Sequence, residues 1–189
     1  MKLSEDEKKF LLNCARKSIL SVLINEDAIP PIDYTLYPNL NEKHGVFVTL
    51  NMQDELRGCI GFTTAQGDLF ASVCQAAKYA AFEDPRFVPV NLNELERISI
   101  EISILSAPVP IKNYSEIKIG EHGLLLDEDF IRALLLPQVA VENNYDVPQF
   151  LEALCIKAGL PSSYWKKQKL HLQVFTAAIF SESEEDENE

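Results

Sequence analysis

One run of alternating residues constrains the fold of this chain more than any other feature. Between Ile98 and Leu105, isoleucine occupies every second position, and Ser99, Glu101 and Ser103 stand between the isoleucines. Successive side chains of a strand point to opposite faces, so this pattern predicts a strand with one buried and one polar face. Glu101 lies at the centre of the polar side, where it can act as an acid or base if that face lines a site. If the face is merely solvated, Glu101 has no special role.

The rest of the chain mixes helical and strand-like segments without a regular strand–helix alternation. Ser4 and Glu7 form a capping-box pattern at the start of one helix, and Asp68 can cap another. This mixture favours an α+β fold, with an antiparallel-rich sheet and helices packed on it, over a doubly wound sheet. The predicted elements are a helix at 4–24, an extended loop at 28–44, a hairpin with arms at 45–50 and 55–62, a helix at 68–82, strands at 98–105 and 123–126, a helix at 148–158 and a strand at 170–180.

Charge argues against nucleic acid as a partner. The chain has 17 basic and 29 acidic residues, a formal net charge of −12, whereas binding to a polyanion requires clustered lysine and arginine. Residues 181–189 contain six of the acids and no base, so half of the excess lies in this segment. We expect residues 1–180 to form one domain and residues 181–189 to form an acidic, disordered tail.

Several other classes of protein are disfavoured by what the sequence lacks. No stretch reaches the roughly 18–20 apolar residues of a membrane helix, and the first residues are acidic where a signal peptide is basic. We therefore expect a cytoplasmic protein with free thiols and no membrane association. No phosphate loop, dinucleotide fingerprint or zinc-ligand spacing is present, so we expect no cofactor and no metal bound by this chain.

The segment Arg57-Gly58-Cys59-Ile60-Gly61 is the strongest candidate for chemistry. In an extended strand Arg57 and Cys59 point to the same face. A guanidinium beside a thiol favours the thiolate, the form of cysteine that acts as a nucleophile or metal ligand. Gly58 and Gly61 have no side chains, so a ligand or another backbone can come close. The alternative is a structural cysteine in a strand with bulge-forming glycines.

The remaining candidates have weaker patterns. Three other cysteines lie on the apolar faces of predicted helices, where core packing explains them. His122 lies in a loop that enters a strand, without the spacing of a metal ligand. Arg86, in Asp84-Pro85-Arg86-Phe87, belongs either to a site or to an ion pair at a helix end. The three cysteines are Cys14, Cys74 and Cys155.

The hexapeptide Leu56-Arg57-Gly58-Cys59-Ile60-Gly61 resembles the signature of the AMMECR domain family, called protein A of the AmmeMemoRadiSam system in prokaryotes. The similarity extends in order over residues 5–180. Two positions depart from the family pattern: Ala133 stands where glycine is expected, and Tyr145 replaces a tryptophan. The other matching segments are Gly45–Leu50, Ala80–Phe87, Ile100–Ser106, Gly120–Leu124, Leu135–Val139, Lys157–Leu160 and Trp165.

The resemblance implies an α+β domain of two unequal lobes with the hexapeptide near the cleft between them. It also implies partnership with a Memo-type protein and a radical SAM protein, in the modification of protein, RNA or small molecules. Carried over residue by residue, the candidate catalytic residues are Cys59 and Arg57, with Glu101 and His122 as further members. Candidate ligand-binding residues, for a small anionic ligand, are Gly58, Gly61 and Arg86.

Two hypotheses follow from these observations. In the first, the protein is an enzyme or enzyme component that uses Cys59 as a nucleophile, assisted by Arg57. In the second, it is a noncatalytic binding, scaffold or regulatory module in which Cys59 is structural. A Cys59 side chain inside the core, without charged neighbours, would favour the second. RNA binding is a third possibility, which the acidic charge disfavours. The oligomeric state is not encoded in any recognisable pattern.

Overall fold

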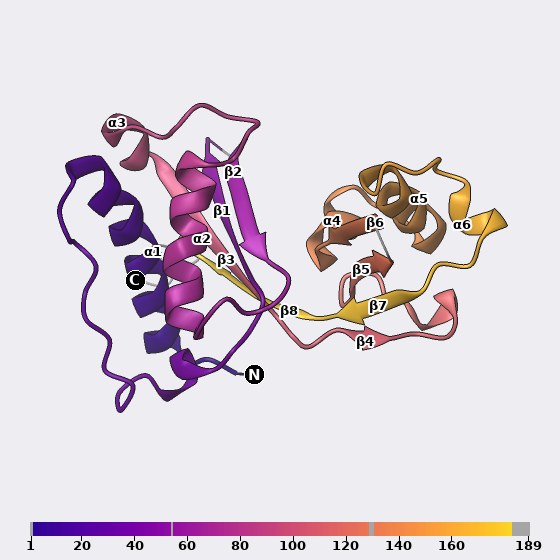
Figure 1. The fold of residues 1–189 in the computed structure, drawn as a ribbon, viewed down its shortest axis with the longest axis horizontal. Coiled ribbons are helices and arrows are strands. Elements are labelled where there is room, and N and C mark those ends of the chain that lie inside the picture. The colour runs from indigo at the N-terminus through magenta and orange to yellow at the C-terminus, as the bar shows by residue number, and fades with distance from the viewer. Residues whose placement is uncertain (1, 54, 129–130, 183–189) are drawn as a thin grey trace. The chain divides into compact units, whose positions relative to one another are not determined.

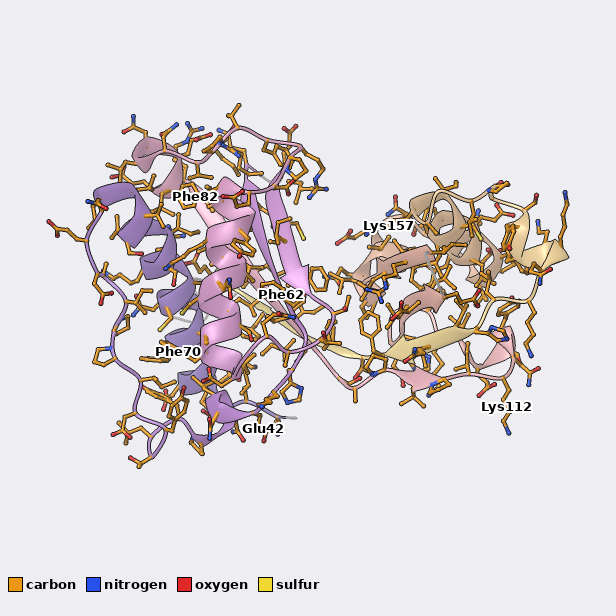
Figure 2. The ribbon with its side chains drawn as sticks, viewed as in Figure 1. Glu42, Phe62, Phe70, Phe82, Lys112 and Lys157 are labelled. Carbon is orange, nitrogen blue, oxygen red and sulfur yellow. The ribbon has the colours of Figure 1, made fainter. Side chains whose placement is uncertain are left out.

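The computed structural model describes residues 2–53, 55–128 and 131–182 (Figure 1). The chain divides into two compact units: unit 1 consists of the residues up to Ile104 and those from Ala178 onward, and unit 2 of Leu105–Ala177. Each unit has its own hydrophobic core, and the described residues form two four-stranded sheets. The combination of helices with antiparallel strands confirms the predicted α+β class.

In unit 1, two long helices cover one face of a four-stranded sheet (Figure 1). The elements are α1 (Glu5–Ile24), η1 (Pro38–Asn41), β1 (Val46–Met52), β2 (Glu55–Phe62), α2 (Leu69–Phe82), α3 (Leu92–Leu95), β3 (Ile98–Leu105) and β8 (Ala177–Ser181). The strand order is β2-β1-β3-β8, and β1 pairs antiparallel with both β2 and β3. Strand β2 is therefore an edge strand.

The predicted capping box at the start of α1 is confirmed. Ser4 Oγ accepts the Glu7 N–H at 3.2 Å, and the Glu7 carboxylate accepts the Ser4 N–H at 2.9 Å. Glu7 is buried and also binds Asn39 of η1, accepting its backbone N–H at 3.1 Å and its side-chain amide at 2.9 Å. One carboxylate thus caps α1 and fastens to it the long loop that precedes β1.

The sheet of unit 1 has a buried face and a partly exposed one. Val46, Val48 and Leu50 of β1 are fully buried toward the helices, as are the four isoleucines of β3, each at most 3% exposed. The intervening residues of both strands form the second face. On β3, Ser99 and Glu101 are partly exposed, as the isoleucine spacing predicts, whereas Ser103 is 1% exposed. We call this second face the polar face; its residues on the three paired strands include Phe47, Thr49, Asn51, Cys59, Gly61, Ser99, Glu101 and Ser103.

Unit 2 consists of a second antiparallel sheet with short helices. Its elements are β4 (Val109–Pro110), η2 (Tyr114–Glu116), β5 (Gly123–Glu128), β6 (Ile131–Leu135), α4 (Pro137–Glu142), α5 (Val147–Lys157), α6 (Tyr164–Lys167) and β7 (Leu172–Phe175). The strand order is β4-β7-β5-β6. Phe150, Leu151 and Leu154 of α5 are fully buried in its core, and Gly159 follows that helix in the left-handed conformation at φ +75°.

The prediction of one final strand over residues 170–180 is wrong. The segment contains two strands: β7 pairs with β5 of unit 2, and β8 joins the sheet of unit 1 beside β3. The division occurs at Thr176, whose C=O and N–H bind the N–H and Oγ of Ser106, both at 2.9 Å. The apolar alternation continues through this point, which is why the sequence shows one strand.

The end of β8 reaches into the segment predicted as a tail. Ser181 ends the strand, and the Glu182 carboxylate accepts hydrogen bonds from the Ile100 N–H at 2.8 Å and from Arg16 Nε at 2.8 Å. Arg16 also donates to two carbonyl groups near the start of β3, which ties α1 to this edge. The remainder of the predicted tail, residues 183–189, lies outside the described residues.

Candidate functional site

The hexapeptide forms most of β2, and a bulge changes how its residues face. The β1–β2 register pairs Thr49 with Cys59 and Leu50 with Gly58, then passes to Asn51 with Leu56. Arg57 is therefore the extra residue of a β-bulge and has no partner across the ladder. We expected Arg57 and Cys59 to share a face from two-residue alternation, and the bulge breaks that alternation between them.

Cys59 lies on the polar face in a row with two other polar side chains. Thr49 of β1 is paired with Cys59 on one side and with Glu101 of β3 on the other. Directly opposed residues of antiparallel strands point to the same face, so a thiol, a hydroxyl and a carboxylate stand side by side. The Thr49 hydroxyl donates to Cys59 Sγ at 3.4 Å, and Cys59 is partly exposed. Glu101 makes its own contacts within the structure and is partly exposed.

The two glycines of the hexapeptide allow close packing. A Cβ added to Gly58 would lie 2.2 Å from the backbone oxygen of Ala80, so the missing side chain lets α2 rest directly on β2. A Cβ added to Gly61 would lie 2.5 Å from the Phe47 ring and 2.2 Å from the Val46 oxygen. The predicted role of Gly58 and Gly61 in ligand binding therefore has a packing explanation at both positions.

The turn after α2 closes the outer edge of β2 at Cys59. An edge strand leaves the N–H and C=O of alternate residues without a neighbouring strand. The Cys59 N–H donates to Asp84 Oδ2 at 2.9 Å, and the Cys59 carbonyl accepts from Arg86 Nη2 at 3.3 Å. Asp84 and Arg86 are themselves joined, Oδ1 to Nε at 2.9 Å and Oδ2 to Nη2 at 2.7 Å. This pair occupies both main-chain groups of Cys59.

The electrostatics of this pair keep both members charged. The hydrogen bond from Arg86 holds the pKa of Asp84 well below its usual range; burial opposes this, and the Cys59 N–H reinforces it. The pKa of Arg86 is raised by Asp84 and, to a smaller extent, by the charge of Cys59. The Asp84 side chain is 2% exposed and that of Arg86 is 54% exposed. The carboxylate is thus the buried anchor, and the guanidinium is the accessible partner.

Arg57 is engaged elsewhere. Its Nε and Nη2 donate to the two carboxylate oxygens of Glu94 at 3.0 and 3.2 Å, and Nη2 also donates to the Val88 carbonyl at 2.9 Å. The guanidinium lies 5.8 Å from the centre of the Phe87 ring, and its buried Nη1 has no hydrogen bond within the described chain. The Arg57 side chain, 9% exposed, thereby fastens the 87–94 loop to β2.

The candidate residues are divided between the two units. Arg57, Cys59, Arg86 and Glu101 belong to unit 1. His122 belongs to unit 2, where its Nδ1 accepts the Lys118 N–H at 3.3 Å and its Nε2 lies 3.7 Å from Glu121 Oε1. Its contacts thus lie within the turn that precedes β5.

The other cysteines are buried, as predicted. Burial raises the pKa of Cys14 to about 12, with a contribution from Cys74, and burial also raises the pKa values of Cys74 and Cys155. Among the described residues no cluster of three or more histidine, cysteine or acidic side chains could hold a metal ion. No helix in the described ranges is both long and apolar enough to cross a bilayer.

Two residues that contact Cys59 were not among the predicted site residues. Thr49 is found only through the strand register, because it is ten positions away in sequence. Asp84 lies 25 residues after Cys59 in sequence, and its contact with the Cys59 N–H depends on where the turn meets the edge of β2. An acid two residues before an arginine, directly after a predicted helix, is the signal that could have indicated it.

Comparisons with known proteins agree with this fold. A Thermococcus gammatolerans protein is 42% identical over 96% of this chain and 93% of its own length. Protein MK0488 of Methanopyrus kandleri is 42% identical over 97% of this chain and 92% of its own length. The crystal structure of uncharacterized protein PH0010 from Pyrococcus horikoshii has a TM-score of 0.88 at 39% identity, covering 96% of this chain and 94% of that one.

The family assignment rests on a match to nearly the whole chain. The model of the AMMECR1 family matches residues 12–180, which include most of unit 1, all of unit 2 and both strands of the β1–β2 hairpin. The hexapeptide, the Asp84 turn and the β3 strand all lie within this range. The resemblance noted from the sequence is thereby confirmed. This chain belongs to the AMMECR1 family.

Proposed function

We propose that this protein is a thiol-dependent enzyme or enzyme component in which Cys59 is the nucleophile. The observation that carries this proposal is the position of the thiol. Cys59 is partly exposed on the polar face and accepts a hydrogen bond from Thr49, while Cys14, Cys74 and Cys155 are buried. Charged residues contact its main chain, so it is neither inside the core nor without charged neighbours.

Cys59, Thr49 and Glu101, which lie in a row across the sheet, each have a proposed chemical role. The Thr49 hydroxyl stabilises negative charge on the sulfur by donating a hydrogen bond to it. Neighbouring strands are about 4.8 Å apart, so Glu101 lies two spacings, about 10 Å, from Cys59. A substrate lying across Thr49 would meet the thiolate at one end and the carboxylate at the other. The thiolate would form a C–S bond to a carbonyl carbon of the substrate as the electron pair of the C–O π bond moves to the oxygen, which takes a proton from water. Glu101 would exchange a proton with a group at the other end of the substrate.

The biological setting is inferred from the family. We infer that the protein acts in the cytoplasm together with a Memo-type protein and a radical SAM protein, on a protein, RNA or small-molecule substrate. Any redox or metal chemistry would then come from those partners. Copurification with the tagged full chain tests this association. Recovery of both partners with wild-type and Cys59→Ser chains supports it, and recovery of neither contradicts it.

Replacement of Cys59 tests the proposed chemistry. In a strain deleted for the gene, wild type and Cys74→Ser should restore function, whereas Cys59→Ser and Cys59→Ala should not. Cys74 is a matched control because its side chain is buried. Melting temperatures of the purified variants show whether each is folded. Function retained by folded Cys59→Ala would refute the proposal and favour the noncatalytic binding or scaffold module.

A further inference from the structure

We propose that Asp84 and Arg86 are the positioning residues of Cys59: together they fix its main chain and hold a cation beside its thiol. This inference rests on the proposed function of Cys59 as a nucleophile. It replaces Arg57, the cation expected from sequence, with a different arginine. Neither Asp84 nor Arg86 is itself assigned a contact with substrate.

Asp84 and Arg86 hold Cys59 at both of its main-chain groups. Asp84 accepts the Cys59 N–H at 2.9 Å, and Arg86 donates to the Cys59 carbonyl at 3.3 Å. In a ladder these groups would belong to a neighbouring strand, but β2 is at the edge of its sheet. Two side chains of one turn therefore substitute for a strand at this residue, and they hold the backbone from which the thiol projects.

The Asp84–Arg86 pair is itself held in place by further contacts. Asp84 accepts from the Arg86 backbone N–H at 3.1 Å as well as from its guanidinium. The Asp84 carboxylate, which is nearly inaccessible to solvent, thus accepts hydrogen bonds from both Cys59 and Arg86, and it sets the direction of the Arg86 side chain. Arg86 also lies over the Phe87 ring, 5.4 Å from its centre. The guanidinium is restrained by these contacts while half of its side chain stays exposed.

Arg86 and Arg57 differ in what they contact and in how exposed they are. Arg57 leaves β2 at the bulge and ends at Glu94 and Val88, with its side chain 91% buried. Arg86 instead reaches the Cys59 residue directly and is the exposed one of the two. The raised pKa of Arg86, to which Cys59 contributes, agrees with a cation close to the sulfur.

The test is the alkylation rate of Cys59 in the folded full chain, measured with iodoacetamide at pH 7.5 by peptide mass spectrometry. Arg86→Gln should slow alkylation about threefold to tenfold, since an opposite charge nearby favours the thiolate and half-exposure weakens the effect. Arg86→Lys should restore most of the rate, and salt should reduce the difference between wild type and Arg86→Gln. Arg132→Gln is the matched control, because Arg132 forms the same type of pair with Asp127 in unit 2.

Amide hydrogen exchange tests whether Asp84 holds the main chain of Cys59. Asp84→Asn retains an acceptor but not the charge, so the Cys59 amide should exchange about fivefold to tenfold faster. Asp127→Asn should leave it unchanged. Three results would each overturn the inference. They are an alkylation rate in Arg86→Gln equal to that of wild type, an equal loss of rate in Arg86→Gln and Arg86→Lys, and an unchanged exchange rate of the Cys59 amide in Asp84→Asn. These measurements need no substrate. The positioning role of Asp84 and Arg86 can therefore be refuted while Cys59→Ala still abolishes function, and it can be supported while Cys59→Ala retains function.

Discussion

A methyl group at Gly58 should disrupt the contact between α2 and β2. Gly58 faces the helix side of the sheet, opposite Leu50, and an added Cβ would lie 2.2 Å from the backbone oxygen of Ala80. Its φ is not in the left-handed region, so the cost of alanine there comes from the contact and not from the backbone conformation. Because the obstacle is backbone, no side-chain rotation can relieve it. Either the helix or the strand must move.

The size of the effect follows from that distance. Real Cβ atoms stay at least 3.0 Å from such an oxygen, so α2 and β2 must separate by about 1 Å. Overpacking of this kind costs roughly 1–3 kcal/mol, and loss of glycine from the unfolded chain returns about 0.4–1 kcal/mol. We expect Gly58→Ala to lower the free energy of unfolding of unit 1 by about 2 kcal/mol. This is the upper end of the overpacking cost, about 3 kcal/mol, minus about 1 kcal/mol for the reduced entropy of the unfolded chain. The melting temperature should fall by about 4–8 °C.

Gly67→Ala is the matched control. A Cβ there meets only the Ala71 Cβ, at an ordinary 3.7 Å. Hydrogen exchange of peptides from β1, β2 and α2 measures unit 1, while fluorescence of Trp165, the single tryptophan, reports on unit 2. Gly58→Ala should increase exchange in unit 1 peptides, and Gly67→Ala should not. Equal stability of the two variants would refute the steric account of this motif glycine.

Three further predictions concern charge and thiol chemistry. Burial opposes ionisation of Glu7, but its hydrogen bonds lower its pKa, and Arg86 lowers the pKa of Asp84. The two ionised carboxylates therefore stabilise the fold above their ordinary pKa values of 4.5 and 3.8, and this stabilisation is lost as pH falls. The urea midpoint should decline below about pH 4.5, and it should decline less steeply in Glu7→Gln. Cys59 should be the cysteine alkylated in the folded chain, with the three buried ones reacting only after unfolding, as thiol counting by mass spectrometry can show. Glu94→Ala leaves the buried Arg57 without its counter-ion and should destabilise unit 1 by about 2–4 kcal/mol in urea titration, whereas a loss under 0.5 kcal/mol would contradict the fastening role.

Features that depend on neighbouring residues in sequence were predictable. The box between Ser4 and Glu7 and the cap at Asp68 operate within three residues, and both helices begin there. The isoleucine spacing of β3 gave its bounds because burial on one face leaves a two-residue period. In each case the physical cause acts within one element, so the pattern is complete in the local sequence.

Features that depend on which segments meet were not predictable. The predicted elements include no strand at 131–135, where the structure has β6, since pairing with β5 decides the conformation of Leu134 and Leu135. Residues 170–180 have one alternating pattern and two different partners, and the exchange at Thr176 is visible only in its bonds to Ser106. The periodicity of apolar residues indicates which face of a strand is buried, but it does not indicate which strand pairs with it.

The bulge at Arg57 shows why the same limit matters for function. Two-residue spacing placed the arginine and the cysteine of the hexapeptide on one face, and that geometry was the basis for assigning Arg57 to the thiol. One inserted residue removes the basis: Arg57 fastens the 87–94 loop through Glu94, and Cys59 keeps its place opposite Thr49. The cation that reaches Cys59 comes from 27 residues further along the chain, through a turn that closes an edge strand. The hexapeptide therefore combines two tasks, a structural one at Arg57 and Gly58 and a chemical one at Cys59, and substitutions at these positions should separate loss of stability from loss of thiol reactivity.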